Sequence, residues 1–501
     1  MGPDNGREVM RCGSLERLDH LGLRGKEGLW LVDEVSAGHT PCYQGADRSR
    51  PNGSAPCLDG AHLAGEDGLT TRFGGRMRDP VLQTRCCIVG GGPAGLMLGL
   101  LLARSGVDVV VLEKHRDFNR DFRGDTIHPS TLDLIDELGL REKFDAVPQT
   151  ALTTLDVVVN GNRLTPIDFS RLHGANRSIA LMPQWDFLDL LAAEGERHPL
   201  FRLVLGAKVT GLVRQGGRVV GVRADTVDGP IEVNALLTVG ADGRDSVVRD
   251  AAGLVPRSYG IAIDVLWFRL PKTSDPPPDT LGYLNGESMV LTIPRDGYYQ
   301  AAMLIPKGSF AAVRSAGLED FRARIVRAAP FLGEVVDALR SWDEVRLLAV
   351  QVNRLSRWWR PGLLCIGDAA HALSPAFGVG INYAIQDAVA AARLLATPLR
   401  RGELSARDLR AVQRRRLPPV RLMQPIQLAL HRAVAKPGGG AFLHSPMRWR
   451  ERAITAALLP LLRPAAARMV GRGFRPETIG DEPRRRRGLR PTPGGPDRLR
   501  T

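Results

Sequence analysis

The sequence predicts an α/β fold with three parts: a mostly parallel sheet with helices, a mixed β-sheet region inserted into it, and a helical C-terminal region. Three observations lead to this prediction. Segment 86–113 passes through strand, glycine-rich turn, helix and strand patterns, which is typical of a βαβ unit. Strand patterns dominate between 264 and 352, and helical patterns dominate from 382 to 470.

The first predicted elements build the βαβ unit. The strands at 86–89 and 107–112 are apolar throughout, which suits buried parallel strands, and the second of them ends at Glu113. A helix is predicted between them over 93–105. A further helix is predicted over 126–140, because Pro129 stands near its start and Gly139 near its end.

The later elements are read from alternation and helical spacing. Four more strands follow, at 155–159, 202–209, 219–223 and 236–239. The middle block is expected to hold further strands and an amphipathic helix, among them 265–270, 298–305 and 318–327. A long helix is expected from Asn382. Segment 1–76 shows neither strand nor helix period and is expected to be either a disordered extension or sequence upstream of a true start at Met77.

Composition excludes several functional classes. The 501 residues carry a net charge of +14, but much of it is arginine near the end, including Arg484–Arg487. Because no nucleic-acid module accompanies this charge, 476–501 is interpreted as a solvated basic tail and no nucleic-acid partner is expected. The six cysteines lack metal-ligand or CxxC spacing, so no metal site is predicted and reduced thiols in a cytoplasmic protein are expected.

One apolar run could imitate a membrane span. Segment 86–103 consists of apolar residues and glycine. It contains the glycine-rich turn GGGPAG and leads at once into a second strand, so a buried strand and helix are predicted instead of a transmembrane segment. Met1 is followed by polar and glycine-rich sequence, and no signal peptide is expected.

A first motif lies between the two strands of the βαβ unit. Gly90, Gly92 and Gly95 form G-x-G-x-x-G directly after a strand, and Glu113 follows about 20 residues later. The glycines allow a tight turn, close approach of a pyrophosphate, and close helix packing. Glu113 can accept hydrogen bonds from ribose hydroxyls. The motif predicts dinucleotide binding without separating FAD from NAD.

A second motif, LLTVGADGRDSVVR at 236–249, is a strand followed by a turn and a helix start. Asp242 and Gly243 form the turn. On its own this pattern is equally compatible with a ligand-binding turn and with an ordinary turn in which Asp is a structural residue.

A third motif, GDAAHALSPAFGVGIN at 367–382, places a carboxylate at a strand end and then a helix start. A helix start has unsatisfied N–H donors and partial positive charge, which suits an anion or an electron-rich ring. Asp368 and the helix start are therefore expected to converge on one ligand group.

Together, and in this order, the three motifs resemble the FAD-dependent aromatic hydroxylases of the para-hydroxybenzoate hydroxylase family. The resemblance spans residues 80–400. It implies that Gly90, Gly92, Gly95 and Glu113 hold the ADP half of FAD, and that Asp368 binds the ribityl chain. Further cofactor contacts implied by the resemblance come from Arg123, Gln184, Val209, Asp242, Gly243, Pro375, Gly380, Ile381 and Asn382.

Several of these residues also have a structural interpretation. Arg123 could be a loop charge, and Gln184 could cap a helix or lie on the surface. His371 is interpreted as a packing and hydrogen-bonding residue in preference to a general base. Two positions depart from the family pattern: Ser374 stands where many relatives have proline, and Phe377 where many have glycine.

The resemblance also implies an activity. NAD(P)H would reduce FAD, and a flavin C4a-hydroperoxide would insert one oxygen atom into a small aromatic or polyketide-like substrate by hydroxylation or epoxidation. The alternative is an FAD-dependent reductase of the geranylgeranyl reductase type. The substrate domain is expected at 151–182 and 260–352, with a helical region at 401–475. No catalytic side chain, substrate identity or oligomeric state is assigned.

Overall fold

The computed structural model describes residues 80–119, 126–275, 282–285, 288–295, 297–434 and 448–480. All of them belong to one compact unit, Glu66–Thr501. The extension predicted at 1–76, the predicted cofactor residue Arg123, and the predicted tail beyond 480 lie outside the described residues.

The largest sheet has eight strands in the order β19-β20-β11-β1-β2-β8, with β10 and β9 continuing from β11. Their bounds are β1 Val81–Val89, β2 Val109–Glu113, β8 Phe201–Leu205, β9 Lys208–Gln215, β10 Arg218–Thr226, β11 Gly229–Gly240, β19 Trp359–Arg360 and β20 Leu363–Cys365. The neighbours from β20 to β8 run parallel, whereas β9, β10 and β19 pair antiparallel. Parallel strands are buried on both faces, which explains their continuous apolar sequences.

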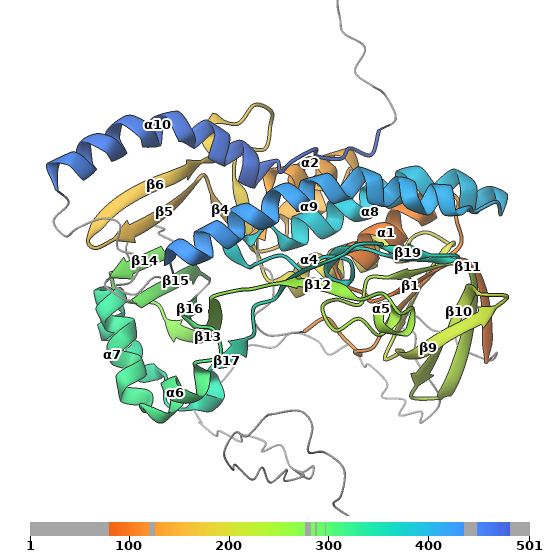
Figure 1. The fold of residues 1–501 in the computed structure, drawn as a ribbon, viewed down its shortest axis with the longest axis horizontal. Coiled ribbons are helices and arrows are strands. Elements are labelled where there is room, and N and C mark those ends of the chain that lie inside the picture. The colour runs from red at the N-terminus through yellow and green to blue at the C-terminus, as the bar shows by residue number, and fades with distance from the viewer. Residues whose placement is uncertain are drawn as a thin grey trace, which may run out of the picture. The chain divides into compact units, whose positions relative to one another are not determined.

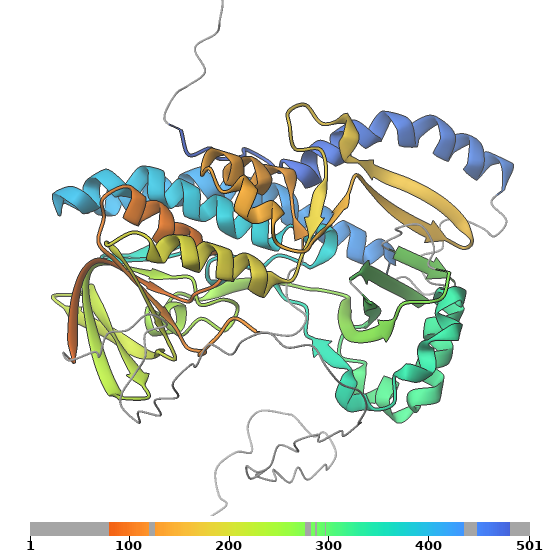
Figure 2. The ribbon, with the colours of Figure 1, turned by 180° about the vertical axis from the view of Figure 1, so that it is seen from behind.

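Four helices accompany this sheet (Figures 1 and 2): α1 Pro93–Arg104, α4 Gln184–Glu196, α8 Gly380–Arg401 and α9 Ala406–Val434. Every residue of α1 from Ala94 to Ala103 is buried. Helix α8 is followed by Gly402, whose φ of +76° gives the left-handed cap that glycine adopts without strain. The main hydrophobic core therefore lies between the parallel sheet and these helices.

A second sheet has seven strands in the order β17-β13-β16-β15-β14-β5-β6. Their bounds are β5 Thr154–Val159, β6 Asn162–Asp168, β13 Ile263–Pro271, β14 Gly282–Asn285, β15 Ser288–Pro294, β16 Tyr298–Pro306 and β17 Arg346–Leu348. It is mixed, because β14 pairs parallel with β5. Helices α6 Phe310–Ser315 and α7 Leu318–Ala328 belong to the same region, where Phe268 and Phe321 meet edge to face in a separate core.

The remaining elements connect these parts. They are β3 Thr126–Ile127, α2 Pro129–Glu137, α3 Arg141–Asp145, β4 Thr150–Leu152, β7 Ile179–Leu181, α5 Val247–Ala251, β12 Pro256–Tyr259, β18 Val352–Leu355 and α10 Trp449–Gly471. In Figure 1, α10 runs beside β5 and β6, and the Arg463 Nε donates to the carbonyl oxygen of Thr165 in β6 at 2.7 Å. The predicted α/β fold class is confirmed by this architecture and by similar solved structures reported below.

Two predicted elements were wrong in their extent. The helix expected over 126–140 is a short strand, β3, followed by α2, because Pro129 occupies the first helical position and excludes an earlier start. The strand expected over 202–209 is two strands, β8 and β9. Gly206 between them has a φ of +71°, which turns the chain.

The apolar run at 86–103 lies in β1 and α1, as predicted, and Cys86, Cys87 and Cys365 are free, buried thiols. Another helix, α10, has the length and composition to cross a membrane, with a mean hydropathy of 1.3 over its most apolar window, of which 11% is buried. Length and composition alone are weak evidence for such a role.

Candidate functional site

The three sequence motifs meet at the carboxyl ends of the parallel strands. Strands β1, β2, β11 and β20 end at one edge of the sheet because they run in the same direction. The turns that follow are hydrogen-bonded to each other: the N–H of Ala241 donates to Val89 at 2.8 Å, and the N–H of Ile366 donates to Gly240 at 2.9 Å. Motifs that lie far apart in the sequence are thus adjacent at this edge.

The glycine-rich turn has room on one side only. Gly90 has a φ of +107°, and a Cβ there would lie 2.4 Å from the carbonyl oxygen of Ala241. A Cβ on Gly95 would lie 1.9 Å from the carbonyl oxygen of Gly90. A Cβ on Gly92 would meet nothing within 4 Å. Gly90 and Gly95 are therefore required by the protein's own packing, whereas Gly92 faces open space.

Glu113 is buried at the end of β2, beside this turn. Its carboxylate accepts hydrogen bonds from the N–H groups of Gly91, at 2.8 Å, and His115, at 3.0 Å. The Glu113 carbonyl oxygen accepts from Ala207 at 2.8 Å, which brings the start of β9, with buried Val209, to the same end of the sheet. The carboxylate thus orders the glycine turn.

Asp242 supports the start of α5 with its side chain, while Ser246 is the N-terminal cap of that helix. It accepts hydrogen bonds from the Ser246 hydroxyl and from the N–H of Val248, at 3.1 Å for the latter. Burial raises the pKa of Asp242 above its usual value. The carboxylate of Asp242 therefore has a structural role in this turn. Gly243 has a φ of +87° and no neighbour near its Cβ position, so it leaves space beside the turn.

An ion pair joins the second and third motifs. The Arg244 Nε donates to the Asp368 carboxylate at 3.1 Å, and about a quarter of the Arg244 side chain and a third of that of Asp368 are exposed. Arg244 was not predicted from the sequence, although it stands two residues after Asp242. The pair places a guanidinium and a carboxylate together at the sheet edge.

Two helix starts converge beside Asp368. A Cβ on Gly367 would lie 3.5 Å from that of Ala94 in α1 and 3.3 Å from that of Ala384 in α8. Neither helix is capped by a side chain at its N-terminus, and neither has an acidic residue in its first turn. The partial positive charges of both helix starts are thus directed toward one region.

Asn382, in the first turn of α8, is held by α2 and β3. Its side-chain oxygen accepts from the N–H of His128 at 2.9 Å and from the Thr131 hydroxyl at 2.7 Å. Its amide donates to the carbonyl oxygen of Thr126 at 3.2 Å. The side chain of Asn382 therefore has a structural role, and the predicted contact through the backbone of Gly380, Ile381 and Asn382 stays a prediction.

The loop before α8 has an unusual backbone. Phe377 has a φ of +67° and lies in the short 3₁₀ helix η6, Ala376–Gly378, which Pro375 precedes with a φ of −65°. Non-glycine residues rarely adopt a positive φ, and a bulky side chain there is strained. The position where many relatives have glycine thus keeps a glycine-like conformation although its residue is phenylalanine.

His371 and a buried charge network lie behind the loop. The His371 Nε2 is 2.6 Å from a carboxylate oxygen of Asp387, and its ring lies 4.9 Å from that of Trp358. The other Asp387 oxygen accepts from Arg416 at 3.0 Å. Burial raises the pKa of Asp387, whereas the charges and hydrogen bonds of His371 and Arg416 lower it. The second effect is larger, so the pKa of Asp387 lies below its usual value. His371 thus packs and hydrogen-bonds, as expected.

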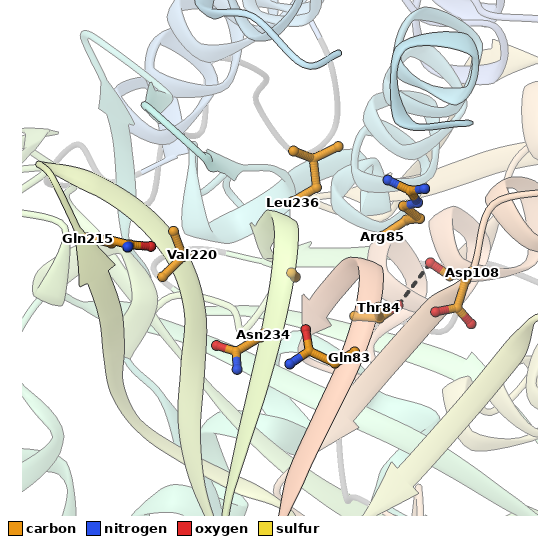
Figure 3. Close-up of a pocket in the computed structure, with 9 residues that line it drawn as sticks. Gln83, Thr84, Arg85, Asp108, Gln215, Val220, Asn234 and Leu236 are labelled. Atoms are coloured by element: carbon orange, nitrogen blue, oxygen red, sulfur yellow. Dashed lines mark hydrogen bonds between the residues drawn. The ribbon is translucent and has the colours of Figure 1, made fainter. Parts of the chain in front are cut away.

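Two predicted cofactor residues, Gln184 and Arg123, add little to the geometry of the site. Gln184 is the first residue of α4 and is half-buried. Arg123 lies outside the described residues. The cavity drawn in Figure 3, of about 630 Å³, is lined by polar residues from the first half of β1, such as Gln83, and from β11, such as Asn234. None of the predicted site residues lines this cavity, so it is not the candidate site.

Comparisons with known proteins identify the family of this chain. Residues 83–424 match the family model of the FAD binding domain. The 6-methylpretetramide 4-monooxygenase of Streptomyces rimosus is 36% identical over 360 residues, or 71% of this chain and 85% of that protein. The protoasukamycin 4-monooxygenase of Streptomyces nodosus subsp. asukaensis is 28% identical over 69% of this chain and 87% of that protein.

A solved structure shows the same fold. The anhydrotetracycline hydroxylase OxyS from Streptomyces rimosus aligns with a TM-score of 0.62 at 23% identity, covering 78% of this chain and 76% of that chain. The family match and the relatives confirm the resemblance found in the sequence, and FAD is the cofactor of the family. The chain belongs to the FAD-binding-domain family of FAD-dependent monooxygenases.

Proposed function

We propose that this enzyme binds FAD at the carboxyl edge of the parallel sheet and oxygenates a polyketide-like aromatic molecule. The observation that supports it most is the meeting of two uncapped helix starts, α1 and α8, next to open space at Gly92. N–H donors, positive helix ends and a surface without a Cβ suit a pyrophosphate and an electron-rich ring. The residues present therefore fit FAD.

The proposed contacts follow the sequence prediction. The ADP half would lie along Gly90, Gly92 and Gly95 toward Glu113, and the ribityl chain would reach Asp368. We add Arg244, whose guanidinium already pairs with Asp368 and carries positive charge to the pyrophosphate side. The other proposed contacts remain Arg123, Gln184, Val209, Asp242, Gly243, Pro375, Gly380, Ile381 and Asn382.

Bound FAD would supply the redox chemistry, accepting a hydride from NAD(P)H and activating O2. The protein's own groups would orient and stabilise it. The N-terminus of α8 has no acidic residue in its first turn, so its partial positive charge is available to stabilise negative charge on the ring. We also propose that the segments 151–182 and 260–352 form the substrate domain and exclude water from the reacting groups.

The substrate class rests on the relatives. The names of two of them specify 4-monooxygenation of 6-methylpretetramide and of protoasukamycin. A related aromatic molecule is therefore the proposed substrate here, with O2 as the other partner and the cytoplasm as the proposed compartment. The reductase alternative considered from the sequence is not favoured, because the relatives are named as monooxygenases.

The function is tested with the FAD-loaded full chain. Phenolic and polyketide-like compounds are screened for NAD(P)H oxidation, O2 uptake and a product heavier by one oxygen atom. We expect all three to depend on the substrate. Substrate reduction without O2 uptake would support the reductase instead, and a chain that does not bind FAD would overturn both.

The cofactor site is tested by Gly92→Ala. The added Cβ meets no protein atom within 4 Å, and Gly92 has a φ of −78° that alanine also adopts, so the fold should be unchanged. We expect FAD affinity to fall at least about tenfold, because the methyl group would occupy the proposed pyrophosphate space. The matched control is Gly211→Ala, which also meets nothing within 4 Å but lies in β9. Equal FAD affinity in the two variants would contradict the site.

A further inference from the structure

Helix α9 carries a buried polar stripe. Gln424, Gln427 and His431 are 1%, 0% and 3% exposed. Their spacing of three and four residues puts them on one face of the helix. Buried amide and imidazole groups are costly unless they are hydrogen-bonded, so their partners reveal what the stripe does.

The stripe binds the loop that follows Asp368. The Gln427 side-chain oxygen accepts from the N–H of Ser374 at 3.2 Å, and its amide donates to the carbonyl oxygens of Ser374, at 3.1 Å, and Ala376, at 3.0 Å. The amide of Gln424 donates to the carbonyl oxygen of Ala372 at 3.2 Å. Three alternate residues of the loop are thus held by α9.

His431 completes the attachment. Its Nε2 lies 2.6 Å from the hydroxyl oxygen of Ser374, and this oxygen also accepts from the N–H of Ala376 at 3.0 Å. Burial lowers the pKa of His431 below its usual value, which favours the neutral imidazole. The contact is therefore a hydrogen bond between a hydroxyl group and an imidazole whose neutral form burial favours.

Two contacts of this attachment depend on the residue at position 374. Proline, which many relatives have there, possesses neither the N–H that Gln427 accepts nor the hydroxyl that His431 contacts. A proline ring restricts its own φ, whereas Ser374 is restrained by bonds from α9. Gln427 and His431 also lie beyond residue 424, where the match to the family model ends.

We propose that Gln427 and His431 are positioning residues that act through Ser374 to hold the loop 372–378 in the shape that receives the flavin. The proposal rests on the proposed function, because it assumes that FAD binds beside this loop. In this enzyme, hydrogen bonds from a distant helix restrain the loop at Ser374.

The test is a double-mutant cycle on the full chain. Gln427→Leu and His431→Leu are made alone and together with Ser374→Pro, and the FAD dissociation constant is measured with the visible spectrum of the bound flavin. In the presence of Ser374, each leucine variant should weaken FAD binding about five- to tenfold and alter the flavin spectrum, because each removes at least one buried hydrogen bond. In the Ser374→Pro background, His431→Leu should have no further effect.

Gln413→Leu is the matched control. Gln413 also lies on α9 and also bonds backbone groups, accepting from Trp358 at 3.2 Å and donating to Ser356 at 2.8 Å, but on another loop. It should leave the flavin spectrum unchanged. If Gln427→Leu changes FAD binding and spectrum no more than Gln413→Leu, or if His431→Leu has the same effect with and without Ser374→Pro, the positioning role is overturned. Wild-type protein that binds no FAD would instead overturn the proposed function.

Discussion

Replacing Phe377 by glycine and by alanine measures the strain in the loop before α8. Both changes remove the same aromatic ring, which packs against the main core. The two variants therefore differ in one methyl group and in backbone energetics. At most positions alanine is the more stable choice by about 0.4–1 kcal/mol, because glycine gains entropy in the unfolded chain.

At position 377 the order should reverse. The φ of +67° is left-handed, a conformation that costs an L-residue about 1–2 kcal/mol and glycine almost nothing. After the entropy difference is subtracted, Phe377→Gly should be more stable than Phe377→Ala by about 0.5–1 kcal/mol. For a chain of this size that corresponds to roughly 0.5–1 °C in melting temperature.

The assay is thermal unfolding of the FAD-free variants in one buffer. Ala376→Gly provides the comparison at the neighbouring position, which does not have a positive φ, and it should lower the melting temperature relative to wild type. A Phe377→Ala variant that is as stable as Phe377→Gly, or more stable, would refute the reasoning. The backbone of the loop would then not be strained in the folded protein.

Two further predictions concern buried titratable groups. Asp387→Asn should destabilise the protein by about 3 kcal/mol in urea unfolding, because it removes the carboxylate charge that pairs with buried Arg416 at 3.0 Å and leaves Arg416 only the longer contact with Glu477, at 3.4 Å; a loss below about 1 kcal/mol would contradict this. The pKa of Asp387 is lower in the folded protein than in the unfolded chain. The contribution of its charge to the free energy of unfolding is therefore complete above the unfolded pKa of about 4 and is lost as the pH falls further. Burial lowers the pKa of His128 to about 4, so the unfolded chain, with a His pKa of about 6.5, takes up the proton first. Stability should therefore fall by about 2 kcal/mol from pH 7 to pH 5, and an equally steep fall in His128→Asn would argue against His128 as its source.

Local sequence patterns predicted the glycine turn and the helix start that surround the candidate site. Gly90 and Gly95 are short-range requirements, because each prevents a clash within its own turn or with the adjoining one, and such constraints are visible in the spacing of the motif. The start of α8 was also predictable to within two residues, since a Pro- and Gly-marked loop preceded a helical pattern. Each of these features involves neighbours in the chain or in the adjoining strand.

Contacts between segments far apart in the sequence could not be predicted from local sequence patterns. Arg244 could have been noticed beside Asp242, but its pairing with Asp368 depends on β11 and β20 being neighbours in the sheet. Asn382 was predicted through its backbone, whereas its side chain binds α2, which is about 250 residues away in the sequence. The helical spacing of Gln424, Gln427 and His431 was a sequence signal for the polar contacts of α9, but these contacts were not predicted.

The sequence by itself determined the family, the cofactor and the turns that form the sheet edge, because these depend on residues a few positions apart. Only the tertiary structure decided what holds the loop at Ser374. Its restraint comes from Gln427 and His431, more than 50 residues later. Hydrogen bonds of this kind depend on how α9 packs, and packing arises from the whole core rather than from any local pattern.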